Sequence, residues 1–199
     1  PDFVLMGGTN LYRSADGFAT SIDGTQSDWI GGYSPPALQA FVYPNQHPDQ
    51  HAGVFDPTNP NRYWSGNDGG LYVTDNIQAG TVTWTDRNKG YNVTQFYTVD
   101  LPNRAGDLRV AGGTQDNGSP FFLAGDPNGS SFDISSGDGS YLYLGDAVTY
   151  GSSQNGSMTR WRNSASGQIE SFLGRTQPQG ASGQLFIHPF KADPNDESI

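Results

Sequence analysis

The sequence predicts an all-β protein, a β-propeller made of about four four-stranded antiparallel blades that belong to a larger propeller. Three observations favour this fold class. The 199 residues include 27 glycines and 13 prolines, which suit a chain dense in tight turns. Aromatic residues make up 13% of the chain, and such rings can fill the core between short strands. Finally, one short sequence motif recurs along the chain: an apolar strand, a corner of Gly and polar residues, and a second strand.

Four copies of this corner are recognisable. Each combines Gly with Asn or Asp, which accept the positive φ angles of hairpin turns, between residues that alternate as half-buried strands do. The spacing of roughly 40 to 60 residues is close to the period of a four-stranded blade. The corners lie near residues 7–14, 66–74, 112–119 and 151–160.

We therefore expect one partial propeller domain over residues 1–199. An Asp-Pro-Asx turn near residue 56 precedes the second corner, and a similar turn near residue 193 predicts the start of a further blade. The remaining blades or domains of a parent protein would then be the first partners of this chain.

The charge of the chain narrows the classes of ligand. Its formal net charge is −10, and apart from Glu170 and Glu197 all of its acidic residues are aspartates. Without a basic stripe we expect no nucleic-acid binding, and without an apolar run of about 20 residues we expect no membrane insertion. Short carboxylates suit turn capping or Ca²⁺ binding, so Ca²⁺ is the one cofactor that the composition suggests.

Two sets of motifs resemble a known family. The segment Ser14-Ala15-Asp16-Gly17-Phe18 is similar to the Asp-box, the Ser-x-Asp-x-Gly-x-Thr-Trp hairpin of sialidases, sortilin-type propellers and xyloglucanases, although Ala19-Thr20 replaces the closing Thr-Trp. A longer series resembles the sortilin-like, Asp-box propellers of secreted bacterial proteins of the Bacteroidota type: His47-Pro48-Asp49-Gln50-His51-Ala52, Gly66-Asn67-Asp68-Gly69-Gly70-Leu71-Tyr72, Asn92-Val93-Thr94-Gln95-Phe96-Tyr97, Gly112-Gly113-Thr114-Gln115-Asp116-Asn117-Gly118 and Gly137-Asp138-Gly139.

The resemblance covers about residues 1–160. It implies a propeller fold and a secreted or cell-surface protein. Members of this family are often described as glycosyl hydrolases by analogy, and the fold by itself does not imply an activity.

Two groups of residues are candidate metal ligands. His47, Asp49 and His51 are spaced by two, so in an extended segment all three would share one face of a strand and form half of a metal site. The alternative is a polar strand end whose histidines bond to loop backbone. Asp68, Asp116 and Asp138 lie in Gly-turned, oxygen-rich corners and could bind Ca²⁺, or each could cap its own turn.

The corners should gather at one end of the propeller and form its binding surface. We expect that surface to include His47, Asp49, His51, Asp68, Gln115, Asp116, Asn117 and Asp138, together with Trp29 on a long insertion. The resulting hypothesis is an extracellular, non-catalytic module that binds a protein or a glycan or spaces other domains. The alternative is part of a xyloglucanase- or sialidase-type glycoside hydrolase that uses a pair among Asp68, Asp116 and Asp138.

Overall fold

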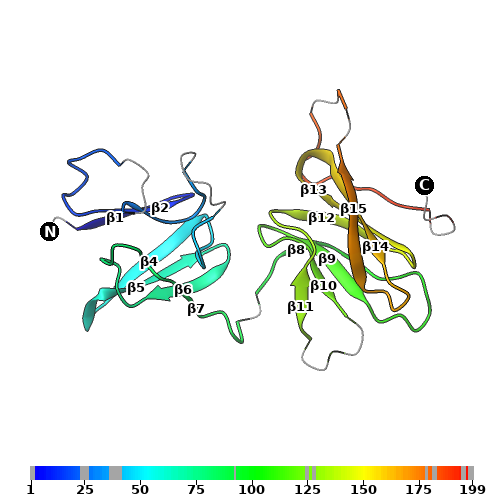
Figure 1. Cartoon of the computed structure of the whole chain (residues 1–199), viewed down its shortest axis with the longest axis horizontal. Coiled ribbons are helices and arrows are strands. Elements are labelled where there is room, and N and C mark those ends of the chain that lie inside the picture. The colour runs from blue at the N-terminus through cyan, green and yellow to red at the C-terminus, as the bar shows by residue number, and fades with distance from the viewer. Residues whose placement is uncertain are drawn as a thin grey trace. The chain divides into compact units, whose positions relative to one another are not determined.

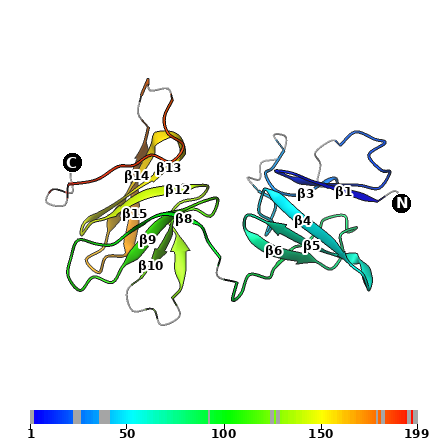
Figure 2. The same ribbon diagram turned by 180° about the vertical axis from the view of Figure 1, so that it is seen from behind.

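The computed structural model describes residues 3–22, 27–35, 42–91, 93–123, 126, 129–177, 179–180, 183–193 and 196. These residues form fifteen β-strands and one 3-10 turn, η1 (Gln154–Gly156) (Figures 1 and 2). The strands are β1 (Val4–Gly7), β2 (Leu11–Ser14), β3 (Trp29–Gly31), β4 (Gln50–Asp56), β5 (Asn59–Asn67), β6 (Gly70–Thr74), β7 (Thr85–Asp86), β8 (Phe96–Asp100), β9 (Val110–Thr114), β10 (Pro120–Phe122), β11 (Ser131–Asp133), β12 (Gly139–Leu144), β13 (Val148–Ser153), β14 (Ser157–Asn163) and β15 (Ile169–Thr176).

Consecutive strands pair antiparallel and form four sheets. Three sheets have four strands each, β4 to β7, β8 to β11 and β12 to β15, and the first has the three strands β1 to β3. This up-and-down order is the order of propeller blades. The predicted fold class, all-β with four-stranded antiparallel blades, is therefore confirmed. The recurrent corners join β1 to β2, β5 to β6, β9 to β10 and β13 to β14.

By their contacts the residues form two compact units, residues 1–92 and residues 93–199. The first unit holds the sheets β1–β3 and β4–β7, and the second holds β8–β11 and β12–β15. At the predicted turn near residue 193, the Asp196 N–H donates to the Asp193 carbonyl at 3.3 Å. One propeller domain over residues 1–199, with a further blade from residue 193, stays a prediction.

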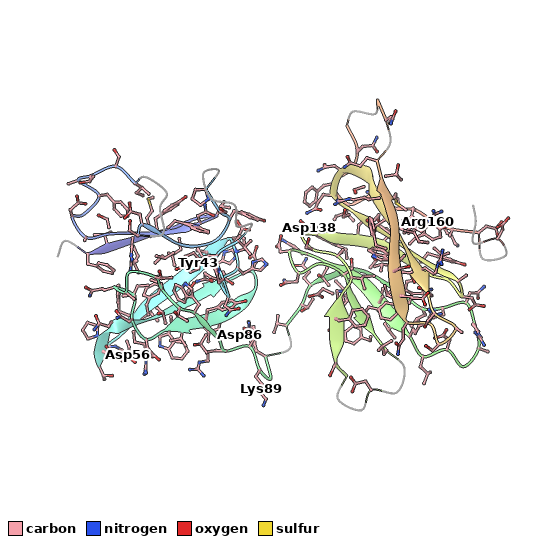
Figure 3. All side chains as sticks on the ribbon, in the orientation of Figure 1. Tyr43, Asp56, Asp86, Lys89, Asp138 and Arg160 are labelled. Carbon is pink, nitrogen blue, oxygen red and sulfur yellow. The ribbon has the colours of Figure 1, made fainter. Side chains whose placement is uncertain are left out.

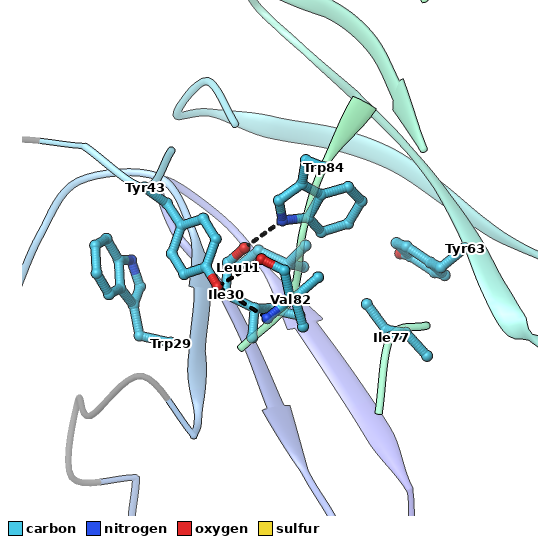
Figure 4. Packing of buried hydrophobic residues seen from close by; sticks show 8 residues of the cluster. All are labelled: Leu11, Trp29, Ile30, Tyr43, Tyr63, Ile77, Val82 and Trp84. Atoms are coloured by element: carbon cyan, nitrogen blue, oxygen red, sulfur yellow. Dashed lines mark hydrogen bonds between the residues drawn. The ribbon is translucent and has the colours of Figure 1, made fainter. Parts of the chain in front are cut away.

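The core of the first unit is built largely from aromatic rings (Figure 4). Trp84 and Tyr43 hydrogen-bond through their polar atoms, whereas the buried indole N–H of Trp29 has no partner among the described residues. The Trp84 indole N–H donates to the Ile30 carbonyl at 2.7 Å, and the Tyr43 hydroxyl donates to the Val82 carbonyl at 2.9 Å. Large rings can be fully buried when the polar atom finds a partner. The cluster, which joins residues of both sheets, comprises Leu11, Trp29, Ile30, Tyr43, Tyr63, Ile77, Val82 and Trp84.

The expectation of an exposed, ligand-binding Trp29 is wrong. Trp29 is the first residue of β3, is 1% exposed and packs edge-on against Tyr43 with 4.9 Å between ring centroids. Its neighbour Asp28 accepts a hydrogen bond from the Arg13 backbone N–H, which aligns β3 with β2. The Gly-rich sequence after Trp29 indicated a loop, whereas strand pairing buries the ring.

In the second unit two glycines let the sheets β8–β11 and β12–β15 approach closely. A Cβ at Gly113 would lie 1.9 Å from the Ser140 carbonyl oxygen, and one at Gly139 would lie 2.2 Å from the Gly118 carbonyl oxygen. Any other side chain would push the strands apart. Beside this contact the two sheets share a small apolar core of Ala111, Phe121, Leu142 and Leu144.

A buried arginine links the two sheets of each unit. Arg13 on β2 donates to the Ile77 carbonyl at 2.6 Å, in the loop between β6 and β7. Arg109, just before β9, donates to the carbonyls of Gly145 and Gly167, both at 3.0 Å, in turns of the β12–β15 sheet. Burial lowers the pKa of Arg13, but a guanidinium stays charged in a protein, so these carbonyls compensate a real buried charge.

One acceptor of each arginine, Ile77 for Arg13 and Gly167 for Arg109, lies in a turn that opens with a hydroxyl residue, and a turn of this kind also follows β2. In Ser14-Ala15-Asp16-Gly17-Phe18 the Ser14 hydroxyl accepts the Phe18 N–H at 2.8 Å, and in Ser164-Ala165-Ser166-Gly167-Gln168 the Ser164 hydroxyl accepts the Gln168 N–H at 3.2 Å. Gly17 and Gly167 both have positive φ, 68° and 80°. Ile77 follows Thr74 by three residues, as Gly167 follows Ser164, so both arginines contact the fourth residue of such a turn.

Candidate functional site

Asp138, which is labelled in Figure 3, is the centre of a hydrogen-bonded cluster in the second unit. Its Oδ1 accepts the Tyr97 hydroxyl at 3.3 Å and the Asp116 backbone N–H at 3.2 Å, and its Oδ2 accepts the Gln154 side-chain N–H at 2.9 Å. The residue is 7% exposed. Both carboxylate oxygens therefore accept hydrogen bonds, from donors on β8, in the corner before β10 and in η1.

The cluster affects the acidity of Tyr97. Partial burial raises the pKa of Tyr97 above its usual value, and the charge of Asp138, the hydrogen bond to it and the charge of Asp116 raise it further. The phenol therefore stays protonated and serves as a hydrogen-bond donor. A phenol held in this state supports a carboxylate acceptor and does not act as a base.

The corner that carries Asp116 is held by backbone bonds to the corner that carries Asp138. The Gly118 N–H donates to the Gly137 carbonyl at 2.7 Å, and the Thr114 hydroxyl donates to the Gly118 carbonyl at 2.8 Å. Asp116 has a φ of 62°, the left-handed conformation that Asp tolerates in turns. The structure thus brings Asp116, in the β9–β10 corner, next to Asp138, in the connection between β11 and β12.

Gln115 and Asn117 flank Asp116 on the same turn. The Asn117 side-chain N–H donates to the Gln115 carbonyl at 3.2 Å, and the Gln115 backbone N–H donates to the Gln95 carbonyl at 2.9 Å. Both residues are partly exposed. Their role as binding residues stays a prediction.

In the first unit Asp68 and His51 contact each other, from the β5–β6 corner and from β4. The common face predicted for His47, Asp49 and His51 is wrong, because β4 begins only at Gln50 and Asp49 has a φ of 61°, which breaks the extended run. The His47 Nδ1 lies 3.2 Å from the Pro48 carbonyl, a contact to loop backbone. The alternative of histidines bonded at a polar strand end fits this geometry for His47.

Within the described ranges no group of three or more His, Asp or Glu side chains is arranged to hold a metal ion. For Asp138 the geometry favours turn support, because its two oxygens already accept three donors. The Ca²⁺ site and the histidine metal site stay predictions, and the described residues contain no set of ligands arranged for either.

His188 is a half-buried residue that no sequence motif marks. Its Nδ1 accepts the Gly156 N–H at 3.2 Å, and its carbonyl accepts the Ser140 hydroxyl at 3.3 Å. Among the described residues the buried Nε2 has no hydrogen-bond partner. Burial lowers the pKa of His188, so the neutral imidazole that accepts from Gly156 is the folded form.

The second unit should therefore lose stability as the pH falls below about 6.5. As the pH falls, His188 binds a proton in the unfolded chain before it does so in the folded chain, because its pKa is lower in the folded chain. In the folded chain a protonated Nδ1 can no longer accept the hydrogen bond from the Gly156 N–H. Urea unfolding between pH 7.5 and about 5, followed by the fluorescence of Trp161, would measure this loss. The variant His188→Gln should flatten the dependence, and an unchanged slope in that variant would count against the assignment.

No family model matches the chain, and no curated protein matches its sequence. Two solved structures similar to it are the computationally designed Ika8 protein and the periplasmic gluconolactonase PpgL of Pseudomonas aeruginosa. Identity is 16% to the first and 12% to the second, over 96% and 92% of this chain, with TM-scores of 0.35 and 0.34. The chain spans about half the length of each, 51% and 56%.

In the part of the chain that the structure describes, no helix is long and apolar enough to cross a membrane.

Proposed function

We propose that this chain is a non-catalytic propeller module that binds a protein or a glycan within a larger secreted or cell-surface protein. The resemblance to Asp-box propellers of secreted proteins supports its place outside the cell. The blade-type sheets support a rigid scaffold that presents its turns and sheet faces.

One observation carries the non-catalytic part of this proposal. A glycoside hydrolase needs two carboxyl groups that reach the scissile bond from opposite sides of a cleft. Asp138 is 7% exposed and accepts hydrogen bonds from Tyr97, Gln154 and Asp116. A carboxylate so engaged cannot transfer a proton to a substrate without breaking the corner that it supports, so the pair of Asp116 and Asp138 suits structure better than chemistry.

A panel of plant, bacterial and host polysaccharides, incubated with the full chain between pH 4 and 8, tests the proposal. We expect no release of reducing ends above the buffer control, and retention of the chain on at least one immobilised glycan or peptide. Hydrolysis that is lost in Asp68→Asn or Asp116→Asn would overturn the non-catalytic proposal. Exposed Asp146, replaced by Asn, is the matched control.

A further inference from the structure

The sheet β12–β15 has one face that carries unpaired positive charge. Along β14 the side chains alternate: Trp161 is buried with the core, whereas Arg160 and Arg162 are exposed on the opposite face. Arg160 is labelled in Figure 3. Neither arginine makes an ion pair or a side-chain hydrogen bond with any described residue. By contrast, Arg104 and Arg109 of the same unit are paired with Asp146 and Asp107.

The neighbours of these arginines on β13 are apolar or aromatic, and on β15 Arg162 is opposite Ser171. Arg160 pairs with Tyr150 of β13, which in turn pairs with Tyr143 of β12, and Arg162 pairs with Val148. The rings of Tyr143 and Tyr150 lie 6.3 Å apart. On the other side Arg160 is opposite Gly174 of β15, where an added Cβ would meet no atom within 4 Å. The face thus combines two guanidinium groups with the rings of Tyr143 and Tyr150 and with the open space above Gly174.

Two grooves hollow this face on either side of Arg160. One, of about 470 Å³, lies towards Met158 and Gly174, and the other, of about 590 Å³, lies towards Val148 and Leu173. Tyr150 and Arg160 line both grooves. Apolar side chains could fill the hollows while acidic groups reach the guanidiniums between them.

We infer that this face of β12–β15 binds an extended acidic peptide segment of a protein partner. Arg160 and Arg162 are two residues apart on one strand, so their backbone attachment points are separated by about 6.8 Å. Carboxylates at alternate positions of an extended segment have the same spacing, and each can meet one guanidinium in a charge-assisted pair. The inference rests on the proposed binding function and names its ligand class.

Charge and groove chemistry favour a peptide over an acidic polysaccharide. The chain as a whole is acidic, with a net charge of −10, so a local pair of free arginines is a specific point of attraction for an anionic partner. Val148, Met158 and Leu173, which line the grooves beside the polar residues Thr159, Asn163 and Thr176, offer apolar contact to the side chains of a peptide.

The test uses the full chain and a short synthetic peptide that alternates glutamate and valine, with binding followed by calorimetry. A peptide with lysine in place of glutamate and the polyuronate polygalacturonate are the comparison probes. We expect Arg160→Glu and Arg162→Glu each to weaken binding of the acidic peptide by about tenfold. Exposed Arg87, in the other unit, gives the matched control: Arg87→Glu changes the net charge equally and should leave the affinity within about twofold.

Three outcomes would overturn the inference. The acidic peptide does not bind; or Arg87→Glu weakens it as much as Arg160→Glu does, which would indicate attraction by overall charge; or polygalacturonate binds through Arg160 and the peptide does not. The last outcome leaves the proposed binding function intact, because a glycan is then the ligand, whereas hydrolysis of a polysaccharide would overturn the proposed function itself. Far-UV circular dichroism of each variant shows that the sheets are retained.

Discussion

Replacement of Arg109 by methionine should lower the free energy of unfolding of the second unit by about 3 to 5 kcal/mol. The guanidinium is 3% exposed, pairs with Asp107 at 2.7 Å and donates to the carbonyls of Gly145 and Gly167. Methionine preserves much of the apolar stem but leaves the Asp107 carboxylate and both carbonyls without this donor. The loss is large because the Asp107 carboxylate and the Gly167 carbonyl both lose this donor, whereas the Gly145 carbonyl still accepts the Asn163 side-chain N–H at 3.0 Å.

Urea unfolding followed by Trp161 fluorescence measures this effect, because Trp161 is the one tryptophan between residues 93 and 199. Arg104→Met is the matched control: its pair with Asp146 is 3.7 Å long and both side chains are about two-thirds exposed, 66% and 64%. We expect that control to cost less than about 1 kcal/mol. Equal losses in the two variants would contradict the role of Arg109 as the link between the sheets β8–β11 and β12–β15.

Replacement of Asp138 by alanine should cost the second unit about 2 to 4 kcal/mol. The change removes the acceptor of the Tyr97 hydroxyl, the Gln154 side-chain N–H and the Asp116 backbone N–H at once. The three hydrogen bonds are part-buried, so water replaces the lost acceptor only in part. The expected result is a lower urea midpoint in the transition that Trp161 reports.

Asp138→Asn separates hydrogen bonding from charge. An amide oxygen can still accept from Tyr97 and from the Asp116 N–H, so we expect a loss smaller than that of Asp138→Ala. Asp146→Ala, at an exposed aspartate of the same unit, should cost less than about 1 kcal/mol. If Asp138→Ala were as mild as Asp146→Ala, the carboxylate would not support the corner and would be available for a catalytic role.

The fold class could be predicted from local sequence because turns and alternation are local properties. Two strands share one sequence pattern and end in a hydroxyl residue: Leu11-Tyr12-Arg13-Ser14 and Leu71-Tyr72-Val73-Thr74. In each, the final hydroxyl accepts a hydrogen bond from the backbone N–H two residues later, that of Asp16 or of Asn76. Gly and Asn or Asp at the corners predicted the hairpins for the same reason. Serine in place of Asp at Ser166 concealed the third copy of this turn.

The site was less predictable because it depends on which residues meet across sheets. Asp116 and Asp138 could be selected from their corners, but the donors Tyr97 and Gln154 come from positions 41 residues before and 16 residues after Asp138. His188 carries no motif, and its place beside Gly156 follows only from the path of the chain. The prediction for Trp29 was wrong for a related reason. Its local sequence is typical of a loop, but pairing with Tyr12 places Trp29 in a strand, with its side chain buried in the core.

Composition did anticipate the chemistry of the carboxylates. Aspartate far outnumbers glutamate, and several aspartates bond to their own turns, as Asp16 does with the Thr20 N–H at 3.0 Å and Asp56 with the Thr58 N–H at 2.8 Å. These bonds, chiefly those from Thr20 and Thr58, lower the pKa of both carboxyls. Short acidic side chains therefore serve this fold largely as turn supports.

The most direct test of the central claim, that the Asp138 carboxylate supports the fold, is a double-mutant cycle between Asp138→Ala and Tyr97→Phe. The free energy of unfolding of the wild type, both single variants and the double variant gives the coupling between carboxylate and hydroxyl. A structural pair predicts a coupling of about 1 kcal/mol or more. A coupling near zero, with full stability in Asp138→Ala, would contradict the claim and leave the carboxylate available for chemistry.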